Sequence, residues 1–270
     1  MVNRIKRISG IVLIGLTALG ALAGDKPAAG GVVLKADYSA RQQWNYAATY
    51  TSQGNFRQKS SNTAKSTEIR CFFTATKKGA AKLGVKVDSV ATKSDVYKED
   101  LQKEIRDKLI KADYSLSLAN GFPSIDTSAE MPASSYLEWD LYRQLAKLLP
   151  SLPAKPVKQG FTWERTDVVP MQTARGKVTC EVYRNYTLNV LAGDSAMISW
   201  KFRYAGSGKP DSSALTDIPV FGTGNGTAVI DVRAGCILNA EMNFTAPLAM
   251  VGDVSVVWHE KAEIRLIERK

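Results

Sequence analysis

Apolar and polar side chains alternate without a break in Ile198-Ser199-Trp200-Lys201-Phe202-Arg203-Tyr204. Successive side chains of a β-strand point to opposite faces, so this alternation predicts a strand with one buried and one exposed face. The same period recurs at residues 44–50, 67–76, 83–91, 113–119, 160–169, 177–191, 195–205, 226–233, 236–246 and 253–267. Strands of this kind are typical of antiparallel sheets that bury a single face. The sequence therefore predicts a mainly β fold of the α+β class.

Two segments depart from this period and predict helices that cover the sheet. Residues 94–113 begin with Ser94, a good N-cap, and residues 135–149 begin with a capping box, Ser135 and Glu138. Pro150 ends the second segment. Each segment carries an apolar stripe at helical spacing, with Tyr97, Leu101, Ile105 and Leu109 in the first and Leu137, Leu141, Leu145 and Leu148 in the second.

Residues 1–23 have the form of a bacterial signal peptide. Basic residues at its start precede an apolar run at 11–21, and Ala21-Leu22-Ala23 provides the small residues that a signal peptidase requires. The apolar run is about half of the roughly 20 residues that a membrane-spanning helix needs. We expect export to the periplasm or beyond the cell, with removal of this leader and no transmembrane segment afterwards. Asp25 stands where a lipoprotein has its lipidated cysteine, so we expect no acylation.

The rest of the chain is expected to form two related lobes. After a flexible lead at residues 24–42, a first β lobe at 43–150 contains both helices, and a second β lobe occupies 151–270. In each lobe a strand that bears a tryptophan is followed by long strands that bear a cysteine and then by a hairpin. The corresponding residues are Trp44 and Trp163, Cys71 and Cys180, and the turns Asn120-Gly121 and Ala234-Gly235. This order predicts a pseudo-duplicated chain whose lobes share one continuous sheet.

Charge and histidine content argue against several classes of function. The net charge is +10, but Lys and Arg alternate with Asp and Glu instead of forming a stripe, so no nucleic-acid partner is expected. His259 is the one histidine, and it falls on the exposed side of its predicted strand. Histidine-based catalysis or a histidine metal site would depend on this residue alone, so we expect neither. The glycine-rich run at residues 222–227 lacks the Lys of a P-loop, so we interpret it as a flexible connection and expect no cofactor.

Paired carboxylates leave a second class of function open, a hydrolase that acts on envelope polymers. The candidate residues are Glu138, Asp140, Asp167 and Glu260. Glu260 interrupts the apolar face of residues 253–267, where an inward carboxylate needs a partner or has a shifted pKa. A bulge or bend of the strand at Glu260 is the other interpretation, and the one that we favour.

The three cysteines, Cys71, Cys180 and Cys236, all fall on apolar faces of predicted strands. In an exported protein this odd number allows one disulfide and one free thiol. Three small buried side chains without a disulfide are the alternative. The sequence has no Cys-x-x-Cys motif and no histidine near a cysteine, so a zinc or redox site is not expected.

The motif Lys155-Pro156-Val157-Lys158-Gln159-Gly160-Phe161-Thr162-Trp163 and the later hairpin at residues 231–235 resemble a family of uncharacterised secreted bacterial proteins. The resemblance covers residues 110–268. That family is similar in turn to lipoprotein carriers, whose fold is a curved antiparallel half-barrel covered by helices. The resemblance therefore implies a strongly curved antiparallel sheet, or half-barrel, with two covering helices. It supplies no catalytic residues.

An apolar face rich in aromatic side chains is the candidate functional site. Its members are Trp44, Tyr46, Tyr50, Phe73, Trp200, Phe202, Tyr204 and Trp258. A curved sheet under a helical cover can leave a lipid-sized cavity, although the same side chains can instead fill a dry core. We expect a non-enzymatic exported envelope protein that binds an apolar, lipid-like ligand or another envelope protein.

Overall fold

The computed structural model describes residues 31–34, 43–58, 61–78, 82–111, 113–119, 122–124, 148–153, 155–173, 176–210, 218–249 and 255–270. The strands are β1 (Gln43–Gln58), β2 (Ser61–Lys78), β3 (Lys82–Ser94), β4 (Asp113–Ala119), β5 (Phe122–Ser124), β6 (Thr162–Thr173), β7 (Gly176–Ala192), β8 (Ser195–Pro210), β9 (Ile218–Asp231), β10 (Cys236–Ala249) and β11 (Ser255–Arg269). One described helix, α1 (Glu99–Lys111), follows β3. The mainly β prediction is confirmed.

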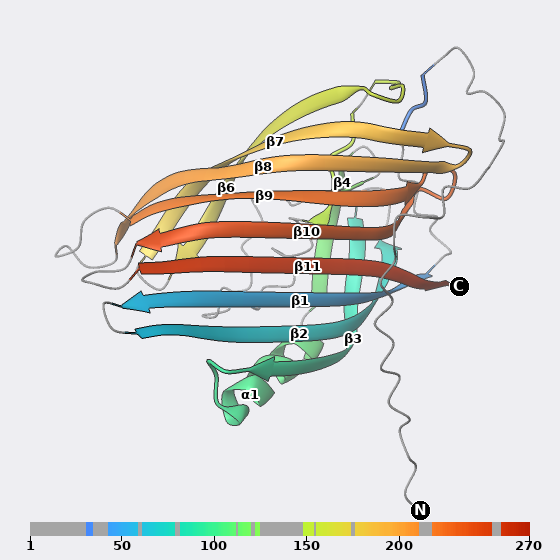
Figure 1. The fold of residues 1–270 in the computed structure, drawn as a ribbon. Coiled ribbons are helices and arrows are strands. Elements are labelled where there is room, and N and C mark those ends of the chain that lie inside the picture. Colours follow the sequence, from blue (N-terminus) through green and yellow to red (C-terminus); the bar gives the residue numbers. More distant parts are fainter. Residues whose placement is uncertain are drawn as a thin grey trace, which may run out of the picture.

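All eleven strands belong to one antiparallel sheet with the order β5-β4-β3-β2-β1-β11-β10-β9-β8-β7-β6. The sheet consists of two meanders that meet where β1, the first strand, pairs with β11, the last (Figure 1). Figure 1 draws β4 and β5 at one edge, and β6 at the other, behind the middle strands, so the sheet is not flat. In the described part of the chain the two edges do not pair with each other, and the sheet remains open.

The two meanders can be compared with the repeat that the sequence predicts, which stays a prediction. Both meanders advance in the same direction across the sheet, so β6 holds in the second meander the place of β1 in the first, and β7 that of β2. Trp44 and Trp163 lie on these two opening strands, and Cys71 and Cys180 on the two that follow. The β4–β5 and β9–β10 hairpins also correspond, although the turn Asn120-Gly121 lies outside the described residues.

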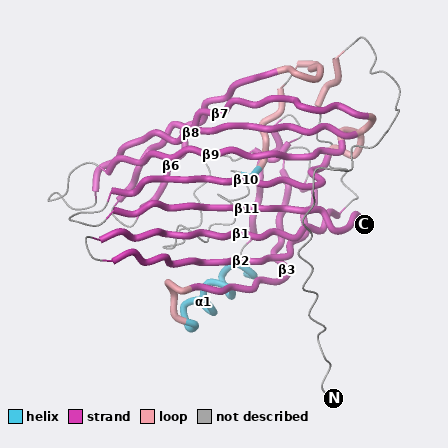
Figure 2. The backbone as a smooth tube through the Cα atoms, in the orientation of Figure 1, coloured by secondary structure: helices cyan, strands magenta, loops and turns pink. Residues whose placement is uncertain are grey.

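One face of the sheet, called here the inner face, carries the core, and the opposite face is called the outer face. In β8 the side chains of Ile198, Trp200, Phe202 and Tyr204 are buried on the inner face, while Lys201 is exposed on the outer face. A single core cluster extends along the inner face from β3 to β7. Figure 2 shows these long strands running side by side, with α1 at the β3 edge.

Two segments outside the strands contribute to the same core. Leu34, Leu148, Leu152 and Val157 are buried in the core cluster. Val32 and Val157 form an isolated antiparallel bridge, with both backbone hydrogen bonds at 2.8 Å between nitrogen and oxygen. The inner face is therefore covered in part by residues 31–34, from the predicted lead, and by residues 148–153 and 155–157, from the junction of the two predicted lobes.

The helix predicted at residues 94–113 exists, but it begins at Glu99. Ser94 is the last residue of β3, and its Oγ accepts hydrogen bonds from the backbone of Val96 and Tyr97, so it caps a turn before the helix. The predicted stripe is confirmed, because Ile105 and Leu109 are buried and the two earlier members pack against the core. The second predicted helix, at 135–149, lies almost wholly outside the described residues. No described helix has the length and apolar character needed to cross a membrane.

The prediction of a flexible connection at residues 222–227 is wrong, because this run lies inside β9. Gly222, Gly224 and Gly226 face the inner side, where aromatic rings from the neighbouring strands occupy the space of their missing side chains. A Cβ built on Gly224 would lie 2.3 Å from the ring of Phe202, and one on Gly226 would lie 2.3 Å from the ring of Trp200. These glycines let the rings lie flat on the strand.

Candidate functional site

The predicted aromatic residues all face the inner side of the sheet. Seven of them are buried and Trp258 is half-buried. The seven buried ones form two groups rather than one, because β9, β10 and β11 separate β8 from β1 and β2, and Trp258 lies between the groups on β11. The intervening inner face carries small side chains such as Ala228, Ala240 and Ala262 beside larger aliphatic ones such as Ile230, Met242 and Ile264.

The first aromatic group lies on β1 and β2. The rings of Tyr46 and Phe73 stack with their centroids 5.3 Å apart. The hydroxyl of Tyr46 donates to the backbone carbonyl of Ile237 at 3.1 Å, which ties β1 to the start of β10 across β11. Trp44 and Tyr50 are buried on the same strand face. All four members of this group belong to the core cluster.

The second aromatic group is built around β8 and includes three rings that the sequence analysis did not select. Phe244 of β10 stacks on Phe202 at 5.9 Å and meets Tyr204 edge-on at 5.3 Å. Tyr186 of β7 lies 6.2 Å from Trp200, and it stacks on Trp163 of β6 at 5.2 Å between centroids. The sequence pattern could have identified these three rings, because each falls on the apolar face of its own strand. The result is an almost continuous aromatic surface from β6 to β10.

Trp200 has an unusual polar environment within this surface. Its side chain is 2% exposed, and its Nε1 is buried with no hydrogen-bond acceptor among the described residues. Leaving such a donor without a partner costs about 1–3 kcal/mol. A ligand oxygen or a bound water in front of the indole would remove this cost.

Trp258 and Glu260 form a separate polar site on the inner face of β11. The indole Nε1 of Trp258 donates to Oε1 of Glu260 at 3.1 Å. The pairing of β11 with β1 and with β10 keeps its register at Glu260, so there is no bulge at this residue, and a bend of the strand there stays a prediction. The inward carboxylate has a partner instead. Ser52, opposite Glu260 on β1, is also buried.

A charged cluster lies on the inner face at the β6 edge. Asp167 of β6 accepts from Nε of Arg165 at 2.6 Å through Oδ1, and from Nη1 of Arg184 through Oδ2. Nη1 of Arg165 also donates to Oγ of Ser151 at 2.6 Å, and Nε1 of Trp163 donates to the Ser151 carbonyl at 2.8 Å. Arg184 is buried, with 8% of its side chain exposed. The sequence analysis selected Asp167 as a carboxylate but missed the two arginines, which only the β6–β7 register brings together.

The two described carboxylate candidates, Asp167 and Glu260, lie on different strands and do not contact each other. Asp167 is bound to two guanidinium groups on β6 and β7, and Glu260 is bound to an indole on β11. Glu138 and Asp140 lie outside the described residues. Each described candidate thus has a structural partner that is not a second carboxylate.

The three cysteines lie on different strands, β2, β7 and β10, and none forms a disulfide. All three are buried, and Cys71 and Cys180 lie on the inner face of their strands. Burial raises the pKa of the Cys71 thiol to about 12 and that of Cys236 to about 11. Thiols of this kind are protonated at neutral pH and are poor nucleophiles.

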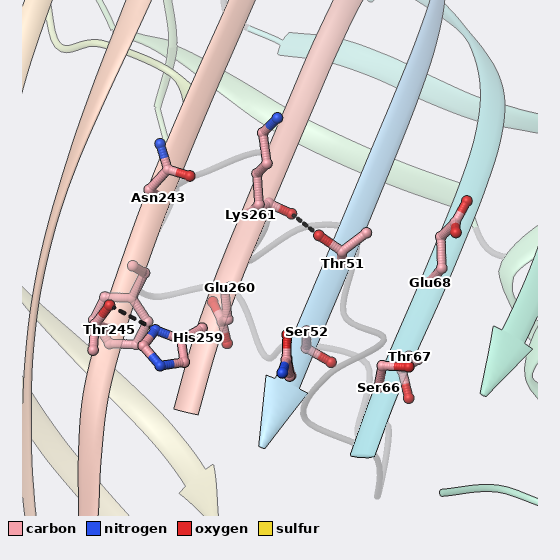
Figure 3. A pocket seen from close by; sticks show the side chains of 12 residues that line it. Thr51, Ser52, Ser66, Thr67, Glu68, Asn243, Thr245, His259, Glu260 and Lys261 are labelled. Carbon is pink, nitrogen blue, oxygen red and sulfur yellow. Dashed lines mark hydrogen bonds between the residues drawn. The ribbon is translucent and has the colours of Figure 1, made fainter. Parts of the chain in front are cut away.

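His259 lies on the outer face of β11, where the alternation places it. Nδ1 of His259 and Oγ1 of Thr245 are 3.1 Å apart, and Lys261 stands on the same strand (Figure 3). These residues line a shallow hollow of about 310 Å³ together with Thr51, whose Oγ1 lies 3.5 Å from the Lys261 carbonyl. All of the residues that line it except Phe244 are polar or charged, so it differs in composition from the inner face.

Comparison of the sequence with family models and with characterised proteins finds no match. Among solved structures, one of lipovitellin, described as showing lipid–protein interactions in that protein, matches 87% of this chain with a TM-score of 0.55. The sequences share 9% identity, and the match covers 26% of the lipovitellin chain, so this chain spans about a quarter of that protein's length. The similarity shows a shared sheet fold. The resemblance to secreted bacterial proteins stays a prediction.

Proposed function

We propose that the protein binds an apolar, lipid-like ligand on the inner face of its sheet and has no catalytic activity. The observation that carries the proposal is the aromatic surface around β8, in which the buried Nε1 of Trp200 has no acceptor among the described residues. Apolar surfaces with few polar groups are typical of small-molecule sites. Such a surface suits a hydrocarbon chain that carries a hydrogen-bond acceptor.

The fold comparison gives independent support. Lipovitellin is the subject of a structure that concerns lipid–protein interactions, and its sheet resembles this one over most of the present chain. A shared fold does not by itself transfer a function, so the ligand is argued from the inner face.

Binding of a neutral apolar probe tests the proposal. We expect N-phenyl-1-naphthylamine to bind the protein saturably, with a rise in its fluorescence, and Trp200→Ala to weaken binding. Phe221→Ala is the matched control, because Phe221 is exposed on the outer face of the adjacent strand β9. Absence of saturable binding up to the solubility of the probe would overturn the proposal and favour a protein-binding module.

The same variant distinguishes a ligand cavity from a filled core. In a dry, filled core, truncating a buried tryptophan costs about 3–5 kcal/mol of unfolding free energy. If Trp200 borders ligand space, we expect a smaller loss in the ligand-free protein, because part of the side chain already lacks neighbours. Urea denaturation of the protein and of Trp200→Ala measures this loss.

Export to the bacterial envelope is the second part of the proposal, and it is supported by the leader-like residues 1–23. N-terminal sequencing and intact mass of protein recovered after secretion should place the new terminus near Gly24, without a lipid. An intact Met1, or an acylated terminus, would contradict export with cleavage.

The outward position of His259 predicts that His259→Ala leaves ligand binding unchanged.

A further inference from the structure

We infer that the inner face contains a binding site for the anionic headgroup of an amphipathic ligand, formed by Arg165 and Arg184. This inference rests on the proposed function and names its ligand class, a hydrocarbon chain that ends in a carboxylate or phosphate. The site lies at the β6 edge of the aromatic surface.

The charge of the cluster is the first argument. Arg165 and Arg184 stand directly opposite each other on β6 and β7, an arrangement of like charges that is unfavourable without a shared counter-ion. Asp167 supplies one negative charge, with one carboxylate oxygen bound to each guanidinium. Two positive charges and one negative charge leave an excess of one positive charge. Glu260, another acid of the inner face, is on β11 and binds Trp258.

Burial makes this excess charge significant. Arg184 is 8% exposed and Asp167 is 17% exposed, so water screens this pair poorly, whereas Arg165 is 38% exposed and open to a ligand from solvent. A buried charge without full compensation destabilises the protein, and a second anion beside the arginines would offset that effect. The cluster is therefore arranged to accept one more negative group.

The available donors fit a headgroup with two oxygens. A guanidinium has five N–H groups in a planar fork that matches carboxylate and phosphate. In the part of the chain that the structure describes, Arg184 donates through Nη1, and Arg165 donates through Nε and Nη1. The remaining N–H groups of Arg184 and Nη2 of Arg165 can bind a second anion while Asp167 stays in place.

The position of Arg184 also fits an amphipathic ligand. In the sheet register Arg184 lies opposite Phe202, which stacks on Phe244. A headgroup at the arginines would thus place the start of a hydrocarbon chain on the second aromatic group. On the other side, Ser151 is held by Arg165 and Trp163, so the segment 148–153 borders the headgroup site.

Competition between matched ligands tests the inference. We expect oleate to displace N-phenyl-1-naphthylamine at about tenfold lower concentration than oleyl alcohol, which has the same chain without the charge, because charge-assisted hydrogen bonds favour the anion. Acetate and inorganic phosphate at the same concentrations should displace nothing, since they lack the chain. Equal displacement by oleate and oleyl alcohol, or displacement by the free anions, would overturn the inference while leaving probe binding intact. Failure of the probe to bind would overturn the proposed function and this inference with it.

Four variants locate the effect. Arg184→Gln and Arg165→Gln should each reduce the preference for oleate over oleyl alcohol to about threefold or less. Because Arg165 is more exposed, Arg165→Gln still tests the site if Arg184→Gln fails to fold. Asp167→Asn removes the competing carboxylate and should strengthen oleate binding, the opposite change. Arg203→Gln is the control for net charge, because Arg203 lies over Tyr183 on the outer face. An unchanged preference in both inner-face arginine variants, or an equal loss in Arg203→Gln, would overturn the assignment.

Discussion

Gly224 lies where rings from two neighbouring strands pack flat against β9. A Cβ at this position would approach Phe202 Cζ at 2.3 Å and the Asn243 carbonyl oxygen at 2.4 Å. The Phe202 ring could rotate away, but the Asn243 carbonyl oxygen belongs to the backbone of β10 and has little freedom to move. The absence of a side chain is thus required by the packing of the second aromatic group.

Gly224→Ala should therefore destabilise the protein by about 2 kcal/mol or more, as overpacking usually does. The sign of the change in unfolding free energy is informative. At an open site in a strand, Gly→Ala stabilises the protein by restricting the unfolded chain. Asn225→Ala is the matched control, since Asn225 is exposed on the outer face of the same strand. Urea denaturation followed by tryptophan fluorescence measures both. A stabilised Gly224→Ala variant would contradict the packing at β9.

Cys71 and Cys236 should be unreactive in the folded protein at pH 8. Their thiol pKa values, raised by burial to about 12 and about 11, leave far less than 1% of either group as thiolate at that pH. We expect iodoacetamide to label them only after unfolding in urea, as mass spectrometry would show. Phe72→Cys is the positive control, because Phe72 is exposed on the outer face next to Cys71. Rapid labelling of Cys71 in the folded protein would contradict its burial.

Asp231 should make stability depend on pH in the acid range. Desolvation raises the pKa of Asp231, but hydrogen bonds from Ala234 and Arg269 outweigh it and hold this pKa below its ordinary value of 3.8. A carboxyl whose pKa is lower in the folded state stabilises the protein above its unfolded-state pKa and loses this effect as pH falls through the folded-state pKa. Asp231→Asn should thus lower the urea midpoint at pH 6, and the difference should shrink near pH 3. Asp194→Asn, in the neighbouring turn, is the control. A constant difference at both pH values would contradict the shift.

The sequence predicted the long strands more accurately than it predicted where the helix begins. The period of two predicted the long strands because each has one buried and one exposed face. It missed the first half of β9, where glycines replace the apolar residues that would have continued the pattern. Ser94 was misassigned because a serine that caps a turn and one that caps a helix present the same local sequence. Local patterns therefore identify elements better than they identify element ends.

Helix α1 should depend on its inner stripe. Ile105 is 3% exposed and packs in the core cluster, so Ile105→Ala is expected to cost about 2–4 kcal/mol of unfolding free energy. Ile110, five residues on, is exposed, and Ile110→Ala should cost less than about 1 kcal/mol. Thermal or urea denaturation compares the two variants. Equal losses would mean that helix propensity, rather than packing on β3, holds the helix.

At the scale of the whole molecule, the candidate site shows the limit of prediction from sequence. The phase of each strand was enough to place the eight aromatic residues on one face. The partners of Asp167 depend on which strand pairs with β6 and in which register, and the period of two contains neither fact. For the same reason the sequence could not show that Trp44 and Trp200 lie in different groups. Site chemistry that arises between strands requires the fold.

The pairing of β1 with β11 should make the two meanders unfold together. This pairing joins residues between 198 and 225 positions apart, from Arg57 with Ser255 to Trp44 with Arg269, and it is the one strand–strand pairing between the meanders in the described sheet. Ile264 is buried at this junction, opposite Ala48 of β1 and Ala240 of β10, so Ile264→Ala should weaken both meanders. We expect a loss of about 2–4 kcal/mol, with one cooperative transition seen equally by fluorescence and circular dichroism. Hydrogen exchange measured by mass spectrometry should then increase in β2 and in β8 alike. Arg265→Ala is the control, because Arg265 is exposed on the same strand. It should change neither the unfolding free energy nor the hydrogen exchange of β2 and β8 by much. Faster exchange in one meander alone would mean that the halves are separate folding units that happen to share an edge.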